Sequence, residues 1–341
     1  MKTGQLHPSG LPLLVTPEGD ASPAALASFI EAERTALEGH GAVLYRGFSI
    51  ANAQEFEGIA RAIDPGLKND YLGTSPRDAL TEYVFSASEL PPYYPIPQHC
   101  EMSFLPAPPR RLMFCCLVPN QGRGGETPLS DFRAVYRDLD PALRARFEEK
   151  GVRNLRNYAG PRSKRRLDPW KLKRWDEMFH TQDRARVEEI CRGHGLEVQW
   201  GANDRLRLVN QRPAVRTHPR TGEKVWFNHA QVFHPSAAPG EYRRIAARQG
   251  LTRFRLLGAF SAAALFGQGL LQAPEERAMD CTYGDGTPIT TAEMEQVRDA
   301  IWKNLVAFSW QQGDVLAIDN FAVSHGRMPY QGPRQVAVCW A

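Results

Sequence analysis

Apolar residues recur at helical spacing in the first part of the chain and again in its middle. The stretch PAALASFIEAERTALEG, residues 23–39, spaces its apolar residues in this way and ends in glycine, which predicts an amphipathic helix. Residues 54–63 predict a second helix. Residues 134–195 and 239–267 predict two largely helical insertions. Within the first, a helix over 133–150 begins either after Asp131 or, as a second helix, after Asp140 with Pro141 at its first position.

Short runs rich in β-branched and aromatic residues predict the strands. They are AVLYRGF (42–48), YVFSAS (83–88), an extended segment over 97–105, RRLMFCCLV (110–118), EVQW (197–200), RLRLVNQ (205–211), and GDVLAIDNFAVSHGR with QVAVCW within 314–341. We find no internal repeat, no βαβ alternation and no clear linker. The pattern therefore predicts an α+β chain with a mainly β core, forming a single domain over residues 1–341.

Composition limits the function classes only broadly. The chain has 42% hydrophobic and 23% charged residues and a net charge of +4, which is typical of a globular protein and gives no reason to expect a nucleic-acid partner. No secretory signal or membrane span is expected. The six cysteines form no Cys-x-x-Cys pair, so we expect reduced thiols and a cytoplasmic location.

One local exception is a basic run over residues 162–174, where seven basic side chains are concentrated. Such a run is either a solvated surface or a docking site for an anionic partner such as an acidic carrier protein.

The stretch QHCEMSF, residues 98–104, contains an imidazole, a thiol and a carboxylate in consecutive positions. In an extended strand His99 and Glu101 share one face, with Cβ atoms about 6–7 Å apart, while Cys100 points to the other face. Two side chains on one face suit a shared cation, although an ordinary surface strand explains the same triplet. The opposite orientation of Cys100 argues against a hydrolase in which His99 activates this thiol.

A second histidine and an arginine near the C-terminus change this interpretation. His325 ends a predicted strand, and Arg334 stands nine residues later at the start of the next. Two imidazoles and one carboxylate are the facial triad of non-haem Fe(II) oxygenases. An arginine beyond the last ligand can bind the far carboxylate of a keto acid. In a non-catalytic metal-binding barrel, which is the alternative, such an arginine has no purpose.

Motifs along residues 40–340 resemble the Fe(II)- and 2-oxoglutarate-dependent dioxygenases of the taurine dioxygenase type. These are LYRGF around Arg46, QHCEMSF, GGETPLSD, WDEMFHTQDRARVEEIC, HPRTGEKVWFNHAQVFH, TYGDGTPI and DNFAVSHGRMPYQGPR. The resemblance implies a double-stranded β-helix, or jelly roll, with Fe(II), 2-oxoglutarate and O2 as cofactors. It implies His99, Glu101 and His325 as iron ligands, and Arg334 and Thr127 as contacts of 2-oxoglutarate.

The branch that hydroxylates amino acids for natural products, as in the syringomycin pathway, is the most similar. It implies an amino-acid-type substrate, free or tethered to a carrier protein, with hydroxylation as the expected outcome and desaturation or cyclisation as alternatives. The candidate substrate contacts are Arg77, Ser103, Asn228 and His229. The sequence does not decide whether the chain forms a homo-oligomer.

Two positions depart from that branch, since Cys100 stands where asparagine is usual and His229 where glutamine is frequent. Halogenases of this fold replace the carboxylate ligand by a small residue, so Glu101 argues against halogenation. Neutral imidazoles are needed for metal binding, and activity is expected to fall below about pH 6.

Overall fold

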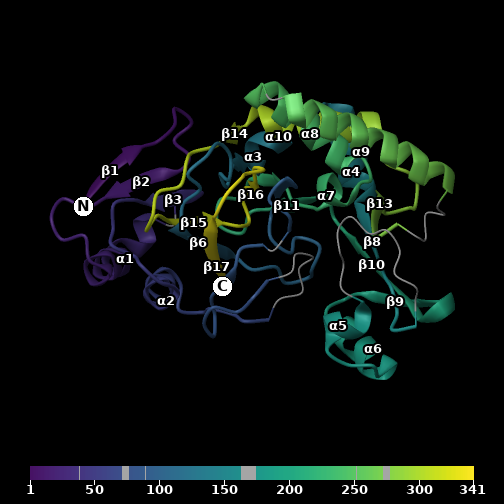
Figure 1. Ribbon diagram of the computed structural model, residues 1–341, viewed down its shortest axis with the longest axis horizontal. Coiled ribbons are helices and arrows are strands. Elements are labelled where there is room, and N and C mark those ends of the chain that lie inside the picture. Colours follow the sequence, from purple (N-terminus) through teal and green to yellow (C-terminus); the bar gives the residue numbers. More distant parts are fainter. Residues whose placement is uncertain (38, 71–76, 89, 163–173, 251, 272–276) are drawn as a thin grey trace. The chain divides into compact units, whose positions relative to one another are not determined.

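A computed structural model describes residues 1–341 except 38, 71–76, 89, 163–173, 251 and 272–276 (Figure 1). The chain forms two compact units, each of which is described here by itself. The first contains residues 1–102, 109–134 and 304–341, and the second contains residues 103–108 and 135–303. The central part of the basic run, residues 163–173, lies outside the described residues, so both predictions for that run stay predictions.

The first unit contains two antiparallel or mixed sheets and two long helices. Its elements are β1 (Lys2–Gln5), β2 (Leu13–Thr16), α1 (Pro23–Leu37), β3 (Ala42–Tyr45), α2 (Ala53–Ile63), β4 (Phe85–Ser86), β5 (Ile96–His99), β6 (Arg111–Val118), β7 (Leu129–Asp131), β14 (Leu305–Val306), β15 (Val315–Asp319), β16 (Val323–Arg327) and β17 (Gln335–Trp340), and α3 (Phe132–Asp138) crosses into the second unit. One sheet has the order β1-β2-β3-β15-β6-β17-β4, and the other has the order β14-β7-β16-β5. The predicted helices over 23–39 and 54–63 and the predicted strand QVAVCW are thereby confirmed, whereas the predicted strand GDVLAIDNFAVSHGR is divided into β15 and β16, which belong to different sheets.

Strand β6 is buried along almost its whole length because both of its faces are covered. Met113 and Cys115 belong to the core that α1 and α2 form with the seven-stranded sheet. On the other face, the Phe114 ring lies 5.2 Å from the ring of His325, which belongs to the four-stranded sheet. A strand covered on both faces needs apolar residues at successive positions. This explains the continuous apolar run RRLMFCCLV and confirms the buried strand predicted there.

The extended segment predicted over 97–105 is wrong beyond its first residues. Strand β5 ends at His99, and residues 101–104 form a turn in which Met102 has a positive φ of 51°. The side chains of His99 and Glu101 therefore cannot be placed by strand alternation. Neither can those of Cys100 and Ser103.

The Asn320 side chain holds the chain where it leaves β5. Its Oδ1 accepts a hydrogen bond from the Glu101 backbone N–H at 2.6 Å, and its Nδ2 donates to the carbonyl oxygens of Glu101 and Pro109 at 3.0 and 2.7 Å. Asn320 is completely buried between β15 and β16. The backbone N–H and carbonyl oxygen of Glu101 are thus both bonded to one side chain from the C-terminal strands.

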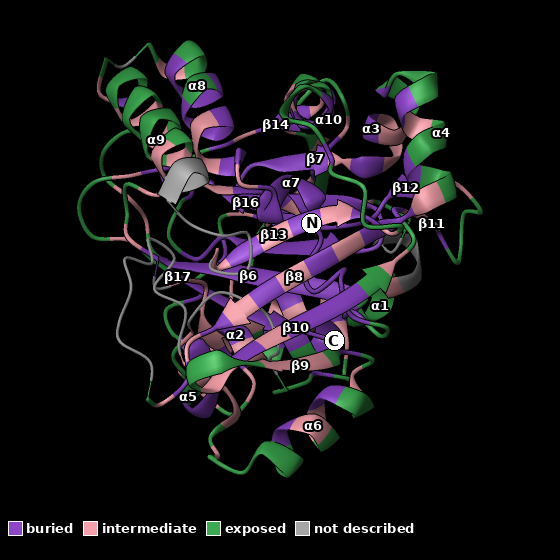
Figure 2. Cartoon of the chain, turned by 90° about the vertical axis from the view of Figure 1, so that its right-hand side faces the viewer, coloured by how far each residue is buried: buried purple, intermediate pink, exposed green. Residues whose placement is uncertain are grey.

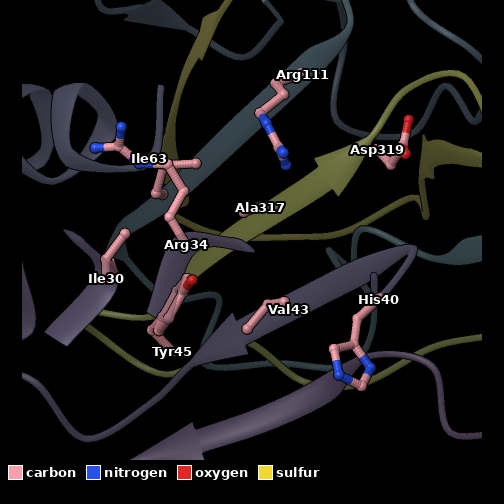
Figure 3. Close-up of a pocket in the computed structure, with 9 residues that line it drawn as sticks. All are labelled: Ile30, Arg34, His40, Val43, Tyr45, Ile63, Arg111, Ala317 and Asp319. Atoms are coloured by element: carbon pink, nitrogen blue, oxygen red, sulfur yellow. The ribbon is translucent and has the colours of Figure 1, made fainter. Parts of the chain in front are cut away.

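A small cavity of about 20 Å³ lies at the edge of the core of the first unit, beside the exposed His40, with room for about one water molecule (Figure 3). Its polar lining residues are Arg34, His40, Arg111 and Asp319, and its other lining residues are Ile30, Val43, Tyr45, Ile63 and Ala317. None of the predicted site residues lines it, and it is too small for a substrate.

The second unit is built on a four-stranded antiparallel sheet with the order β13-β8-β10-β9. Its elements are α4 (Pro141–Lys150), β8 (Val152–Tyr158), α5 (Trp175–Phe179), α6 (Arg184–Gly193), β9 (Glu197–Gly201), a 3-10 turn η1 (Ala202–Asp204), β10 (Arg205–Arg212), β11 (Val215–Thr217), β12 (Lys224–Trp226), α7 (Ala230–Phe233), α8 (Ala237–Gln249), α9 (Thr252–Leu271), β13 (Met279–Tyr283) and α10 (Thr291–Lys303). Asp140 caps α4 by accepting hydrogen bonds from the backbone N–H groups of Ala142 and Leu143. Both predicted starts in this region are therefore confirmed, since α3 begins directly after Asp131, which accepts from the Arg133 N–H, and α4 begins after Asp140.

The prediction of a helical insertion over 134–195 is wrong where β8 runs, and β13 and α10 were not predicted. Along β8 the buried residues are Val152, Asn154, Arg156 and Tyr158, so half of the buried face is polar and the alternation of apolar residues is hidden (Figure 2). Helix α10 did carry a sequence signal. Thr290 Oγ1 accepts from the Glu293 N–H and Glu293 Oε2 accepts from the Thr290 N–H, which is the capping box that T-x-x-E predicts.

Helices α8 and α9 confirm the helical prediction over 239–267 and present an apolar surface. Leu256, Phe260 and Phe266 on α9 are between 67% and 73% exposed, and α9 is coloured as largely exposed in Figure 2. A hollow of about 750 Å³ lies between α8, α9 and the start of α10. Among the helices of the described residues, none is both long and apolar enough to cross a membrane.

We predict that Asn320→Ala lowers the free energy of unfolding by about 3 kcal/mol, because it removes three buried hydrogen bonds and leaves their partners unsatisfied. Chemical denaturation measures this loss. Asn120 is the matched control, since its Nδ2 also donates to three carbonyl oxygens but in a half-buried turn. Asn120→Ala is expected to cost about 1 kcal/mol. Equal losses for both variants would contradict the role assigned to Asn320.

Candidate metal centre

The two predicted histidine ligands meet through strand pairing. Strands β5 and β16 are antiparallel, and their register places His99 directly opposite His325. The two ring centroids are 4.3 Å apart, and His325 is buried. Directly opposite residues on one face of a sheet have Cβ atoms about 4.5–5.5 Å apart. Two imidazoles from distant parts of the sequence therefore converge because of the register alone.

The tautomer of His99 is set by its backbone. His99 Nδ1 lies 2.8 Å from the Pro97 carbonyl oxygen, which can only accept a hydrogen bond, so Nδ1 carries the proton and the lone pair of Nε2 is available to a metal. Burial lowers the pKa of His99, and the attraction of the Glu101 carboxylate only partly offsets this effect. Since the pKa is lowered, this ring stays neutral further into the acid range than an ordinary histidine.

Glu101 completes the group. Its Oε2 lies 3.7 Å from His325 Nε2, and candidate ligand atoms of His99, Glu101 and His325 all lie within 4.8 Å of one another. The same Oε2 accepts a hydrogen bond from Arg77 Nη2 at 2.6 Å, in an ion pair whose side chains are about 5% exposed. The structure therefore places Arg77, predicted as a substrate contact, on the carboxylate of this group.

The three side chains fit a divalent first-row metal. Two imidazoles and one carboxylate are the donor set of the facial triad, and short distances between ligand atoms are what bonds of about 2 Å require. The Phe114 ring beside His325 provides an apolar wall. Cys100 is completely buried, and none of the six cysteines, all of which are described, is disulfide-bonded.

Arg334 and Thr127 also lie side by side in the first unit. Arg334 Nη2 is 3.3 Å from Thr127 Oγ1, and its Nε donates to the Gly125 carbonyl oxygen at 2.7 Å. Trp310 Nε1 donates to the same threonine oxygen at 3.1 Å. Burial lowers the pKa of Arg334 to about 10, so the guanidinium is still charged at neutral pH.

The GGET turn must contain its two glycines to deliver Thr127 to this position. Gly124 and Gly125 have φ values of 89° and 79°, a region that other residues rarely adopt. A Cβ on Gly124 would also collide with the Pro329 carbonyl oxygen, and one on Gly125 would lie 3.2 Å from Arg334 Cδ. The glycines thus allow the turn to approach the segment that carries Arg334.

The remaining predicted substrate contacts belong to the second unit. Ser103 Oγ lies 2.6 Å from His229 Nδ1, and the His229 ring packs edge-on against Phe104 at 5.0 Å. Asn228 has a local structural role: its Nδ2 donates to the Ala214 carbonyl oxygen and its Oδ1 accepts from the Ala230 N–H. The structure thus joins Ser103 with His229, and all three contacts stay predictions.

Sequence reasoning missed Asn320, Trp310 and Phe114. Asn320 lies in the motif DNFAVSHGR, but nothing in the sequence indicates that its amide binds the backbone of Glu101. Trp310 and Phe114 precede or lie within predicted strands and carried no signal of their own. These three residues become visible only through the pairing and packing of the strands.

Two curated relatives are similar over most of the chain. The dapdiamide synthesis protein DdaC of Enterobacter agglomerans is 30% identical over 304 residues, covering 89% of this chain and 82% of the relative. A clavaminate synthase-like protein of Arabidopsis thaliana is 29% identical over 307 residues, covering 88% of this chain and 81% of the relative.

Among solved structures, the PvcB protein of Pseudomonas aeruginosa matches with a TM-score of 0.51 at 14% identity, covering 96% of this chain and 84% of PvcB. PvcB is described as an Fe, alpha-ketoglutarate dependent oxygenase from an isonitrile synthetic pathway. At this level of identity the match concerns the fold, and together with the family match below it confirms the predicted fold class.

A family model described as taurine catabolism dioxygenase TauD, TfdA family matches residues 11–340, which include parts of both units. This match confirms the resemblance that the motifs indicated. The chain belongs to the TauD, TfdA family of dioxygenases.

Proposed function

We propose that this chain is an Fe(II)- and 2-oxoglutarate-dependent dioxygenase that hydroxylates an unactivated C–H bond of an amino acid or an amino-acid-derived substrate in natural-product biosynthesis. Membership of the family makes the chain a dioxygenase with Fe(II), 2-oxoglutarate and O2 as cofactors. The substrate and the hydroxylation outcome are the parts that we propose. We also propose that residues 1–341 act as one dioxygenase domain, because the family match runs through both units.

One observation carries the site assignment: the strand register sets His99 opposite His325, beside Glu101. We assign these three residues as the iron ligands. When bound, iron and 2-oxoglutarate would supply the electrons that activate O2, the oxidant, for attack on a C–H bond. His99 offers Nε2 because Nδ1 is held by Pro97, and Glu101 offers negative charge to the cation.

Arg334 and Thr127 suit the distal carboxylate of 2-oxoglutarate. A guanidinium and a hydroxyl 3.3 Å apart can bind one carboxylate together, because Arg334 supplies a positive charge and Thr127 supplies a hydrogen-bond donor next to it. Because Thr127 Oγ1 accepts a hydrogen bond from Trp310 Nε1, the threonine hydroxyl can donate its own proton to another acceptor, such as this carboxylate. A non-catalytic metal-binding barrel, the alternative expected from sequence, does not explain this pair.

The choice of substrate class is supported by a relative and by the charges of the chain. The 30% identical relative is a dapdiamide synthesis protein. Each unit also contains predicted substrate contacts: Arg77, a cation paired with Glu101, in the first, and the buried hydroxyl and imidazole of Ser103 and His229 in the second. A carrier-tethered substrate stays a prediction, because residues 163–173 lie outside the described part. A cytoplasmic location suits the six thiols.

We predict that adding Fe(II) and 2-oxoglutarate without O2 produces a weak visible charge-transfer band, and that His325→Ala abolishes it. Loss of a ligand should weaken Fe(II) binding by at least about 100-fold, since even residues behind the ligands affect metal affinity by about 10–100-fold. Absorption spectra under anaerobic conditions measure the band. O2-dependent succinate formation, screened over amino acids, then tests the substrate class.

His234→Ala is the matched control, since His234 is equally buried but lies in the second unit, where it binds Ser236 and the Ile289 carbonyl oxygen. This variant should keep the band. A band that survives His325→Ala unchanged would refute the ligand assignment, and an enzyme that makes no succinate with any amino acid would refute the substrate class.

We predict that Arg334→Gln raises the Kd of 2-oxoglutarate roughly 100-fold, because losing the charged partner of a carboxylate costs about 2–5 kcal/mol. Thr127→Val should raise it about ten-fold, as expected for one hydrogen bond. Titration of the charge-transfer band with 2-oxoglutarate at fixed Fe(II) gives both values. Arg123, exposed in the same glycine-rich turn, is the control, and Arg123→Gln should leave the Kd unchanged. An unchanged Kd in Arg334→Gln would show that 2-oxoglutarate binds elsewhere.

A further inference from the structure

The Arg77 side chain is ion-paired with the carboxylate of Glu101, the proposed metal ligand. Arg77 Nη2 and Glu101 Oε2 are 2.6 Å apart, and the two side chains are 5% and 4% exposed. A buried ion pair of this kind is effectively shielded from solvent, so its partners interact strongly. The guanidinium also lies over the Trp340 ring, with Cζ 5.6 Å from the ring centroid. Arg77 therefore contacts both Glu101 and Trp340 within the first unit.

The oxygen that Arg77 binds faces the histidines. Glu101 Oε2 is also the atom 3.7 Å from His325 Nε2, on the side where candidate ligand atoms of His99 and His325 converge. A cation held by the three ligands would share this oxygen, or at least this carboxylate, with the guanidinium. Both partners would then be positive and close together in a buried place, where like charges repel strongly.

The backbone of Glu101 cannot move away to relieve this conflict. Asn320 holds its N–H and its carbonyl oxygen, and strand pairing fixes His99 two residues earlier. Arg77, in contrast, is joined to Glu101 through a long side chain with several rotatable bonds. Of the two groups that meet at Oε2, the guanidinium is the one that can leave.

We propose that Arg77 is the internal counterion of Glu101 in the metal-free protein, and that metal binding displaces it. The metal and the Arg77 guanidinium compete for one carboxylate, so each weakens the binding of the other to the same extent. Resting on the proposed function, this inference also gives the displaced guanidinium a task, because it is then released beside the metal and available to the carboxylate of an amino-acid substrate.

The test is the affinity of the full-length protein for Mn(II) in the absence of 2-oxoglutarate, measured from the EPR signal of unbound Mn(II). We expect Arg77→Gln to bind Mn(II) about ten-fold more tightly than the wild-type chain, a factor in the usual range for coupled sites. A purely structural role of Arg77 predicts the opposite, since damage to the site can only weaken binding. Arg77→Lys keeps the positive charge and should stay within about three-fold of the wild-type value.

Arg46 provides the matched control, because Arg46 Nη2 and Asp314 Oδ2 form an ion pair of the same length, 2.6 Å. Arg46→Gln should leave the Mn(II) affinity unchanged, and thermal melts establish that each variant is folded. Equal or weaker Mn(II) binding by folded Arg77→Gln would overturn the inference while leaving the proposed function intact. A wild-type chain that binds no Mn(II) would instead overturn the assignment of the metal centre itself.

Discussion

The register between β5 and β16 is the constraint on which the metal centre depends. It sets His99 opposite His325, so two imidazoles from opposite ends of the sequence share one face of a sheet. A shift of one residue would turn one histidine to the other face, because side chains alternate along a strand. The same pairing continues into β7, where His325 lies opposite Leu129 and the GGET turn precedes that strand. The four-stranded sheet thus carries both histidines and the strand that follows Thr127, whereas Arg334 directly precedes β17 of the seven-stranded sheet.

Glu101, the proposed carboxylate ligand, is not positioned by strand pairing, because β5 ends at His99. The turn after His99 includes Met102 with a positive φ, an uncommon conformation for a non-glycine residue that surrounding structure must hold in place. Asn320 supplies that support from the β15–β16 connection. Glu101 is thus positioned by the C-terminal strands in the same way as His325, and its ion pair with Arg77 neutralises its charge in a buried place.

The sequence predicted the features that depend on local pattern. Continuous apolar runs predicted β6 and β17, and the spacing of apolar residues predicted α1, α2, α8 and α9. The residue types and their order predicted His99, Glu101, His325, Arg334 and Thr127, and the structure groups the first three together and the last two together. Roles for these five residues could be proposed from the sequence because metal and keto-acid chemistry allows few residue types.

The features that were missed depend on tertiary contacts. Strand β8 buries Asn154 and Arg156 on the face where a half-buried strand usually has apolar residues. The sequence therefore predicts a helical insertion over this region instead of a strand. The turn at Glu101 follows from where strand pairing stops, which no local pattern encodes. The ion pair of Arg77 with Glu101 joins a loop to the turn after β5. The sequence indicates only an arginine with polar neighbours, which suits an amino-acid carboxylate, and does not show this partner.

The most direct test of the metal centre is a crystal structure of the protein grown without O2 in the presence of Fe(II) and 2-oxoglutarate. We predict one iron bonded to Nε2 of His99, to Nε2 of His325 and to the carboxylate of Glu101, with the distal carboxylate of 2-oxoglutarate on Arg334 and Thr127. Iron bound without either histidine, or 2-oxoglutarate held away from Arg334, would contradict it.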